Sequence, residues 1–180
     1  DIEEVRDLDN SLPHMLPSAK QFAAQMSTLG ISSENMVVVY DVHGVQTAPR
    51  AWWTFRAFGH NKIAILNGGL PKWITENRPL SDDIVDGAHG NFHAETVPAL
   101  VRNVDQMLSN QQTREALVVD ARPEGRFNAS APEPRPGLRA GRMPGSVNLP
   151  VNLLVDPASK TFLPADKIRA ALSDAGVADP

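Results

Sequence analysis

Two histidines and an aspartate are the first side chains whose spacing suggests chemistry. His89 and His93 are four residues apart, the spacing that places two metal ligands on one face of a helix. Gly87 and Gly90 disfavour a helix there, so we expect a polar segment with no metal site. Asp41 follows a strongly apolar run, and a carboxylate at a strand end can accept local backbone N–H bonds. Because no partner base is evident at hydrogen-bond spacing, we favour this structural role for Asp41 over a catalytic one.

Cysteine is absent from the 180 residues. The chain therefore has no disulfide, no thiolate metal site and no cysteine nucleophile of its own. The formal net charge is −4 and the pI is about 5.7, whereas nucleic-acid-binding proteins usually carry a basic surface. No run approaches the roughly 18 consecutive apolar residues of a membrane-spanning helix. We therefore expect neither a nucleic acid nor a membrane as a partner.

The start of the chain does not look like a natural N-terminus. The first ten residues, DIEEVRDLDN, contain no Met and no basic-then-apolar signal pattern. We therefore expect a fragment or a processed chain, and we assign it to the cytoplasm.

Apolar patterning in the first half predicts alternating helices and strands. A capping-box pattern at Ser18 and Gln21 precedes an apolar stripe, which indicates a helix over 18–29. The stripe consists of Phe22, Met26 and Leu29. An apolar run over 36–40 has no polar alternation, so it is typical of a strand buried on both faces of a parallel sheet. The elements that follow are a loop over 41–47, a helix over 49–58, a strand over 62–66, a turn over 67–69 and a short helix from Pro71 to Ile74. This order is that of a βαβ unit.

The second half predicts a further set of elements after a polar interval. Residues 79–94 are acidic and aperiodic, and we interpret them as a linker. The elements that follow are a weak helix over 101–108, a strand over 116–120, a loop over 122–145, a strand over 146–149 and a helix over 166–175. The predicted fold class is therefore α/β, with parallel strands flanked by helices.

Three stretches of sequence carry a resemblance to a known family. They are VVVYD (37–41) with the helix after it (48–60), LNGGLPKW (66–73), and VVDARPEGRF (118–127) followed by EPRPGLRAGRMPGSVNLP (133–150). Together they resemble the tandem-domain rhodanese family, the thiosulfate and 3-mercaptopyruvate sulfurtransferases. The resemblance implies a rhodanese-like parallel sheet with flanking helices and two incomplete tandem domains. Residues 1–78 match the latter part of a first, non-catalytic domain, 79–94 a linker, and 95–180 the opening part of a second domain.

The resemblance also implies an activity. Such enzymes move a sulfane sulfur from thiosulfate or 3-mercaptopyruvate to a thiol or cyanide acceptor through a cysteine persulfide, and they need no cofactor. The chain resembles the middle of a longer enzyme that lacks both ends, so we expect it to be inactive alone, because the catalytic cysteine would come after its last residue. Asp41 occupies the loop position that holds cysteine in a catalytic domain. Arg126 is implied as the residue that binds the anionic sulfur donor, since a guanidinium suits carboxylate or thiosulfate oxygens.

Several alternatives remain open from the sequence. The chain could be a non-catalytic rhodanese-like module that acts by binding or regulation. Neither half contains a complete sheet, so the missing strands come either from a second chain, which we favour, or from pairing of the two halves. Asp120 and Arg122 are expected to pair with each other and to tie down the following loop. Arg142 stands where the family usually has histidine, which leaves a histidine-based role there in doubt.

Overall fold

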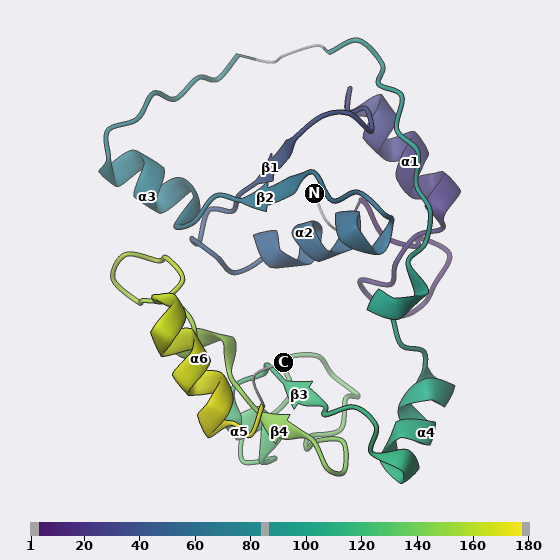
Figure 1. The fold of residues 1–180 in the computed structure, drawn as a ribbon, viewed down its shortest axis with the longest axis vertical. Coiled ribbons are helices and arrows are strands. Elements are labelled where there is room, and N and C mark those ends of the chain that lie inside the picture. Colours follow the sequence, from purple (N-terminus) through teal and green to yellow (C-terminus); the bar gives the residue numbers. More distant parts are fainter. Residues whose placement is uncertain (1–3, 84–86, 178–180) are drawn as a thin grey trace. The chain divides into compact units, whose positions relative to one another are not determined.

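The computed structural model describes residues 4–83 and 87–177, so residues 84–86 of the predicted linker lie outside the described residues. The chain divides into two compact units, Asp1–Val101 and Arg102–Pro180. The predicted α/β class is confirmed, because each unit contains a pair of parallel strands with helices around it (Figure 1). In the described residues these strands form two separate two-stranded sheets.

The first helix, α1 (Ala19–Thr28), begins where the sequence predicts. The Ser18 hydroxyl accepts a hydrogen bond from the Gln21 N–H, and the Gln21 side chain accepts one from the Ser18 N–H at 2.9 Å. Phe22 and Met26 are buried on one face, as the stripe indicates. Leu29 was predicted to share that face, but it is the residue after the last turn and is 66% exposed.

The first sheet is a βαβ unit, as the sequence indicates. Strand β1 (Val37–Val39) pairs in parallel with β2 (Ile63–Ile65), and α2 (Ala48–Ala57) connects them. The prediction that this strand is buried on both faces is wrong, because Val38 is 55% exposed. Val37 and Val39 pack against the core, whereas the opposite face of the pair has no covering layer in the described residues.

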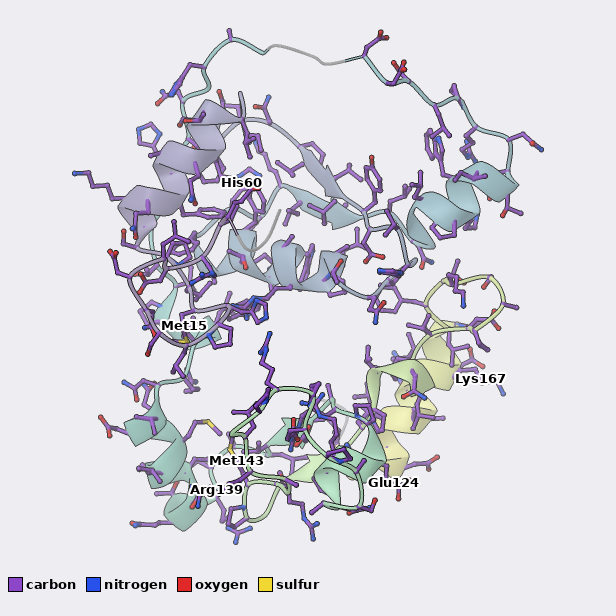
Figure 2. The ribbon with its side chains drawn as sticks, turned by 180° about the vertical axis from the view of Figure 1, so that it is seen from behind. Met15, His60, Glu124, Arg139, Met143 and Lys167 are labelled. Carbon is purple, nitrogen blue, oxygen red and sulfur yellow. The ribbon has the colours of Figure 1, made fainter. Side chains whose placement is uncertain are left out.

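Aromatic rings from three separated segments form the core of the first unit. Phe22 stacks on Phe58 with ring centroids 4.6 Å apart, and Phe55 and Phe92 meet Phe22 edge-on. His60, labelled in Figure 2, is buried beside these rings, and its Nε2 lies 3.0 Å from the Lys62 carbonyl oxygen.

Phe92 lies within the predicted linker over 79–94, and it packs into the core of the first unit. The Gly90 N–H donates to the Ser27 carbonyl at 2.8 Å and the Phe92 N–H donates to the Ser27 hydroxyl at 3.0 Å, so this segment lies against α1. One buried aromatic in a polar stretch produces no periodicity, which is why the sequence pattern missed it. The two compact units divide after Val101, while the assignment of 1–78 and 95–180 to two family domains stays a prediction.

The second unit contains the remaining short elements. Strand β3 (Val119–Asp120) pairs in parallel with β4 (Val147–Asn148). Its helices are α4 (Val104–Thr113), α5 (Glu124–Phe127), η2 (Val151–Leu153) and α6 (Ala165–Asp174). Two further helices belong to the first unit: α3 (Gly69–Thr75), which follows β2, and η1 (Pro98–Leu100) near the end of that unit. The predicted loop over 122–145 is wrong at residues 124–127, which form α5. A helix of four residues is too short to show apolar periodicity, so the sequence pattern did not reveal it. Among the described helices, none has the length and apolar character needed to cross a bilayer.

Candidate functional site

Asp41 lies at the carboxyl end of β1 and is held by the loop that follows it. Its Oδ1 accepts the His43 N–H at 2.8 Å. Its Oδ2 accepts three further backbone N–H groups, from Gln46 at 2.9 Å, Thr47 at 2.8 Å and Ala48 at 2.9 Å. The local backbone bonds expected for a strand-end aspartate are therefore present, and they extend to the first residue of α2.

The protonation state of Asp41 follows from these contacts. Burial leaves the residue 8% exposed, and burial alone raises the pKa of a carboxyl. The four backbone N–H bonds outweigh burial and lower the pKa of Asp41 to about 2. The side chain is therefore a fixed anion near neutral pH, and a carboxylate with so low a pKa is a weak base.

The start of α3 closes over the same loop. Gly69 has φ +52°, and a Cβ there would lie 2.5 Å from the carbonyl oxygens of both Asp41 and Gly44. The Leu70 N–H donates to the Asp41 carbonyl at 3.0 Å. The Gly68–Gly69 pair thus allows two backbone segments to touch.

Asp120, at the end of β3, accepts one backbone N–H, from Arg122 to Oδ1 at 3.0 Å, and its other donors belong to the side chain of the same residue. The Arg122 Nε lies 2.9 Å from the Asp120 Oδ1, and the Arg122 Nη2 lies 2.5 Å from the Asp120 Oδ2. The hydrogen bonds from Arg122 lower the pKa of Asp120 despite partial burial. The predicted pairing of these two residues is confirmed.

Glu133 links this pair to Arg126, the residue that the resemblance implies as the substrate ligand. The Glu133 Oε1 accepts from Arg122 Nη1 at 2.8 Å, and the Glu133 Oε2 accepts from Arg126 Nε at 2.9 Å. Hydrogen bonding to Arg126, with its positive charge, lowers the pKa of Glu133. Two carboxylates thus face two guanidinium groups, and Arg126 is turned toward Glu133.

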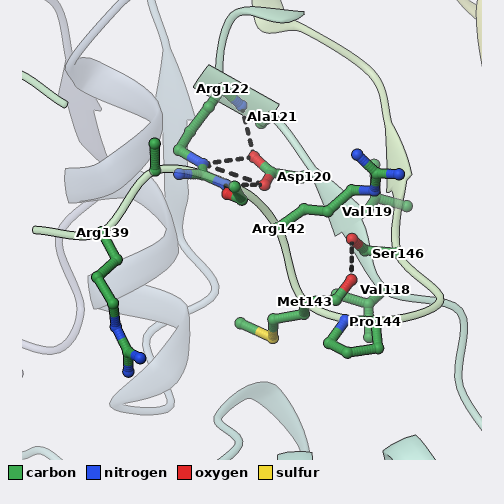
Figure 3. A pocket seen from close by; sticks show the side chains of 12 residues that line it. Val118, Val119, Asp120, Ala121, Arg122, Arg139, Arg142, Met143, Pro144 and Ser146 are labelled. Carbon is green, nitrogen blue, oxygen red and sulfur yellow. Dashed lines mark hydrogen bonds and ion pairs between the residues drawn. The ribbon is translucent and has the colours of Figure 1, made fainter. Parts of the chain in front are cut away.

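A pocket of about 710 Å³ lies beside β3 in the second unit (Figure 3). Its walls come from β3 and the residues after it, and from the loop that precedes β4. The charged residues of its lining are Asp120, Arg122, Arg139 and Arg142. Arg126 is not part of the lining, so its predicted role as a substrate ligand stays a prediction.

The turn expected around Arg142 is present. Gly141 and Gly145 both have positive φ, at +112° and +78°. The Ser146 N–H donates to the Met143 carbonyl at 3.2 Å, which closes the turn before β4. Arg142 itself places its guanidinium carbon 4.6 Å from the Phe127 ring centroid.

Glu133 and Arg139 were missed as site residues by the sequence reasoning. A high density of arginine between Arg122 and Arg142 was the available signal. The partner of each arginine could not be read from it, because Arg122 and Glu133 are eleven residues apart and α5 is the only regular element between them in the described chain.

The two spaced histidines do not come together as ligands. The His89 ring bonds to its neighbour's carbonyl, with Nδ1 2.9 Å from the Gly90 oxygen, while the backbone of His93 bonds to Ser33. Within residues 4–83 and 87–177, no three His, Cys, Asp or Glu side chains are grouped as a metal site would require.

Comparison with known proteins places this geometry in a family. A model described as a rhodanese-like domain matches residues 4–76. The 3-mercaptopyruvate sulfurtransferase of Escherichia coli (strain K12) is 43% identical over 155 residues, which cover 86% of this chain and 55% of that protein. The thiosulfate sulfurtransferase of Gallus gallus is 41% identical over 151 residues, covering 83% of this chain and 52% of that protein. The chain thus spans about half the length of the curated relatives it matches.

A solved structure gives the same result at the level of the fold. A crystal structure from Escherichia coli, described as showing the rhodanese fold and catalytic mechanism of 3-mercaptopyruvate sulfotransferases, superposes with a TM-score of 0.88 at 36% identity. The match covers 99% of this chain and 66% of that one.

Proposed function

Because the chain belongs to the rhodanese-like family of sulfurtransferases, we propose that it forms part of an enzyme that transfers a sulfane sulfur from thiosulfate or 3-mercaptopyruvate to a thiol or cyanide. The observation that carries this proposal is the 43% identity to a 3-mercaptopyruvate sulfurtransferase over 86% of the chain. The nucleophilic cysteine must lie outside these 180 residues, since they contain none.

The reaction proposed for the whole enzyme is a double displacement at sulfur. A cysteine thiolate attacks the outer sulfur of thiosulfate, the S–S bond breaks, and sulfite leaves with the bonding electron pair. The resulting persulfide then gives its outer sulfur to cyanide, which forms thiocyanate and restores the thiolate. Every reacting species is an anion, so the protein must supply positive charge.

This chain would contribute that positive charge from its second unit. Arg126 could bind the donor if its guanidinium left Glu133, and its Nη1 has no partner in the described part of the chain. Asp41 supports the view that the first unit is non-catalytic, because its carboxylate already uses the loop's N–H donors.

The test is an assay of thiocyanate formation from thiosulfate and cyanide, and of pyruvate release from 3-mercaptopyruvate. It compares the 180-residue chain with the complete product of the gene that encodes it. We expect activity in the complete product and none in the chain. An inactive complete product would overturn the proposal.

A second candidate is a non-catalytic rhodanese-like module that acts by binding or regulation. The absence of cysteine from the chain favours it. Inactivity of both proteins in the same assay, together with retained binding of thiosulfate, is the result that would support this module over the enzyme.

A further inference from the structure

The four arginines around the second unit's pocket fall into two classes. Arg122 and Arg126 are both paired with carboxylates, through Asp120 and Glu133. Arg142 has one long polar contact, from Nη1 to the Asn128 Oδ1 at 3.4 Å, and no carboxylate partner among the described residues. Arg139 makes no hydrogen bond or ion pair within the described chain, and Figure 3 shows its side chain extending away from the Asp120–Arg122 pair.

The backbone that carries Arg139 and Arg142 is fixed, although the two side chains are exposed. The Arg122 Nη2 donates to the Gly141 carbonyl at 2.7 Å, which ties the centre of the loop to the end of β3. The Phe127 ring lies under the Arg142 guanidinium at 4.6 Å and holds its position without neutralising its charge. Both side chains therefore start from an ordered loop at the pocket wall.

The charge of the pocket follows from its lining. Asp120 balances Arg122, and no other acidic residue lines the pocket. Arg139 and Arg142 leave two positive charges unmatched beside a space of about 710 Å³. Guanidinium groups present several N–H donors in one plane, and this arrangement fits tetrahedral or planar oxyanions.

We propose that Arg139 and Arg142 make this pocket a binding site that prefers doubly charged oxyanions over singly charged ones. The inference rests on the proposed function, in which thiosulfate is a dianion and 3-mercaptopyruvate carries one carboxylate. The site would thus help to set which donor the enzyme favours. Sulfite, the dianion that thiosulfate releases, shares the same chemistry.

The size of the preference follows from Coulomb's law. Two unit charges about 5 Å apart in a water-like surface environment interact by about 0.8 kcal/mol, which is roughly a fourfold change in affinity. Each arginine should therefore contribute roughly fourfold to the binding of the second negative charge. Salt weakens such a contribution, because exposed charges are screened.

The first experiment is a titration of the 180-residue chain with thiosulfate, inorganic sulfate and pyruvate, followed by amide shifts of residues 140–143 in NMR spectra. These ligands react with nothing in a chain that lacks cysteine. We expect thiosulfate and sulfate to bind more tightly than pyruvate. Equal affinities for the three anions, or no shift at residues 140–143, would overturn the proposal.

Arg139→Gln and Arg142→Gln test the assignment, with Arg169→Gln on α6, outside the pocket lining, as the matched control. We expect each pocket variant to lose roughly fourfold more in thiosulfate affinity than in pyruvate affinity, and the control to lose nothing. An unchanged spectrum elsewhere shows that each variant is folded. Pocket variants that bind thiosulfate as the control does would refute the assignment.

The complete gene product separates this inference from the proposed function. We expect Arg142→Gln to lower the ratio of thiosulfate to 3-mercaptopyruvate turnover. An active protein whose ratio does not change in Arg142→Gln overturns the inference alone. If the complete gene product binds dianions but transfers no sulfur, the proposed enzymatic function is overturned and the inference about the pocket stands.

Discussion

Each unit of this protein has an aspartate at the carboxyl end of the first strand of a parallel pair, and the two aspartates are held mainly by different kinds of donor. Asp41 is surrounded by four backbone N–H groups, which cannot turn toward another partner. Asp120 accepts a single backbone N–H and is otherwise held by the side chain of Arg122, which also contacts Glu133 and the Gly141 carbonyl. Backbone donors fix an anion permanently, whereas arginine donors can exchange one anion for another. The first unit is thus built for rigidity, and the second can respond to a ligand.

Removal of the Asp41 carboxylate should give the largest effect. Asp41→Ala leaves one buried and three partly buried N–H groups without an acceptor, and we expect a loss of about 3 kcal/mol in the free energy of unfolding of the first unit. All three tryptophans lie between residues 52 and 73, so tryptophan fluorescence in urea reports on that unit. Asp82→Ala, at an exposed position, is the control. A loss below about 1 kcal/mol would mean that water replaces the carboxylate.

Acid should have the next largest effect, again on the first unit. The pKa of Asp41 falls from 3.8 to about 2 on folding, so its contribution is present above about pH 4 and is lost as the pH falls through 2. The expected contribution is about 2 kcal/mol. Urea curves give the free energy of unfolding at pH 5 and at pH 2. Between these two pH values the wild type should lose about 2 kcal/mol more than Asp41→Asn does. Equal pH dependence of the two proteins would contradict the assignment.

Arg122→Met should have a smaller effect, on the second unit. It removes the donor to the Gly141 carbonyl and to both carboxylates, but Asp120 keeps the backbone N–H of residue 122 and Glu133 keeps Arg126. We expect a loss of about 1 kcal/mol, seen as faster amide exchange at residues 140–143. The exchange of α6 amides serves as the internal control. Unchanged exchange at residues 140–143 would show that the turn before β4 holds the loop alone.

Glu133→Gln should have the smallest effect, and it should increase binding. Gln keeps the shape but removes the charge that holds Arg126, so Arg126 becomes available to an added anion. We expect thiosulfate to bind about two- to fourfold more tightly, measured by calorimetry at low salt. Glu124→Gln, on the same helix as Arg126, is the control. Weaker binding in Glu133→Gln would show that Arg126 does not exchange partners.

The sequence predicted what local patterns determine. The capping box at Ser18 located α1, and the apolar runs on either side of Pro49 located the βαβ unit. The backbone bonds of Asp41 could be expected because their donors lie within seven residues of it. These features depend on neighbours in the chain, so they can be read before the fold is known.

Features that depend on tertiary packing could not be predicted in this way. Phe92 joins a core whose other rings are more than thirty residues away, so no local pattern marks it as buried. Glu133 pairs with Arg122 and Arg126, although several other arginines are near it in the sequence. The path of the loop in three dimensions determines these partners. The exposure of Val38 depends on how many layers cover the strand, which its own sequence does not specify.

That uncovered face of β1 and β2 has a consequence for solubility. Val38 and Tyr40 line an apolar pocket of about 370 Å³ together with Leu66, Leu70 and Trp73. Sulfate and phosphate salts strengthen the association of such surfaces, because these ions are excluded from apolar groups. The chain should therefore precipitate at lower ammonium sulfate concentrations than its net charge of −4 alone would suggest, and it is best purified and stored in dilute buffers free of such salts.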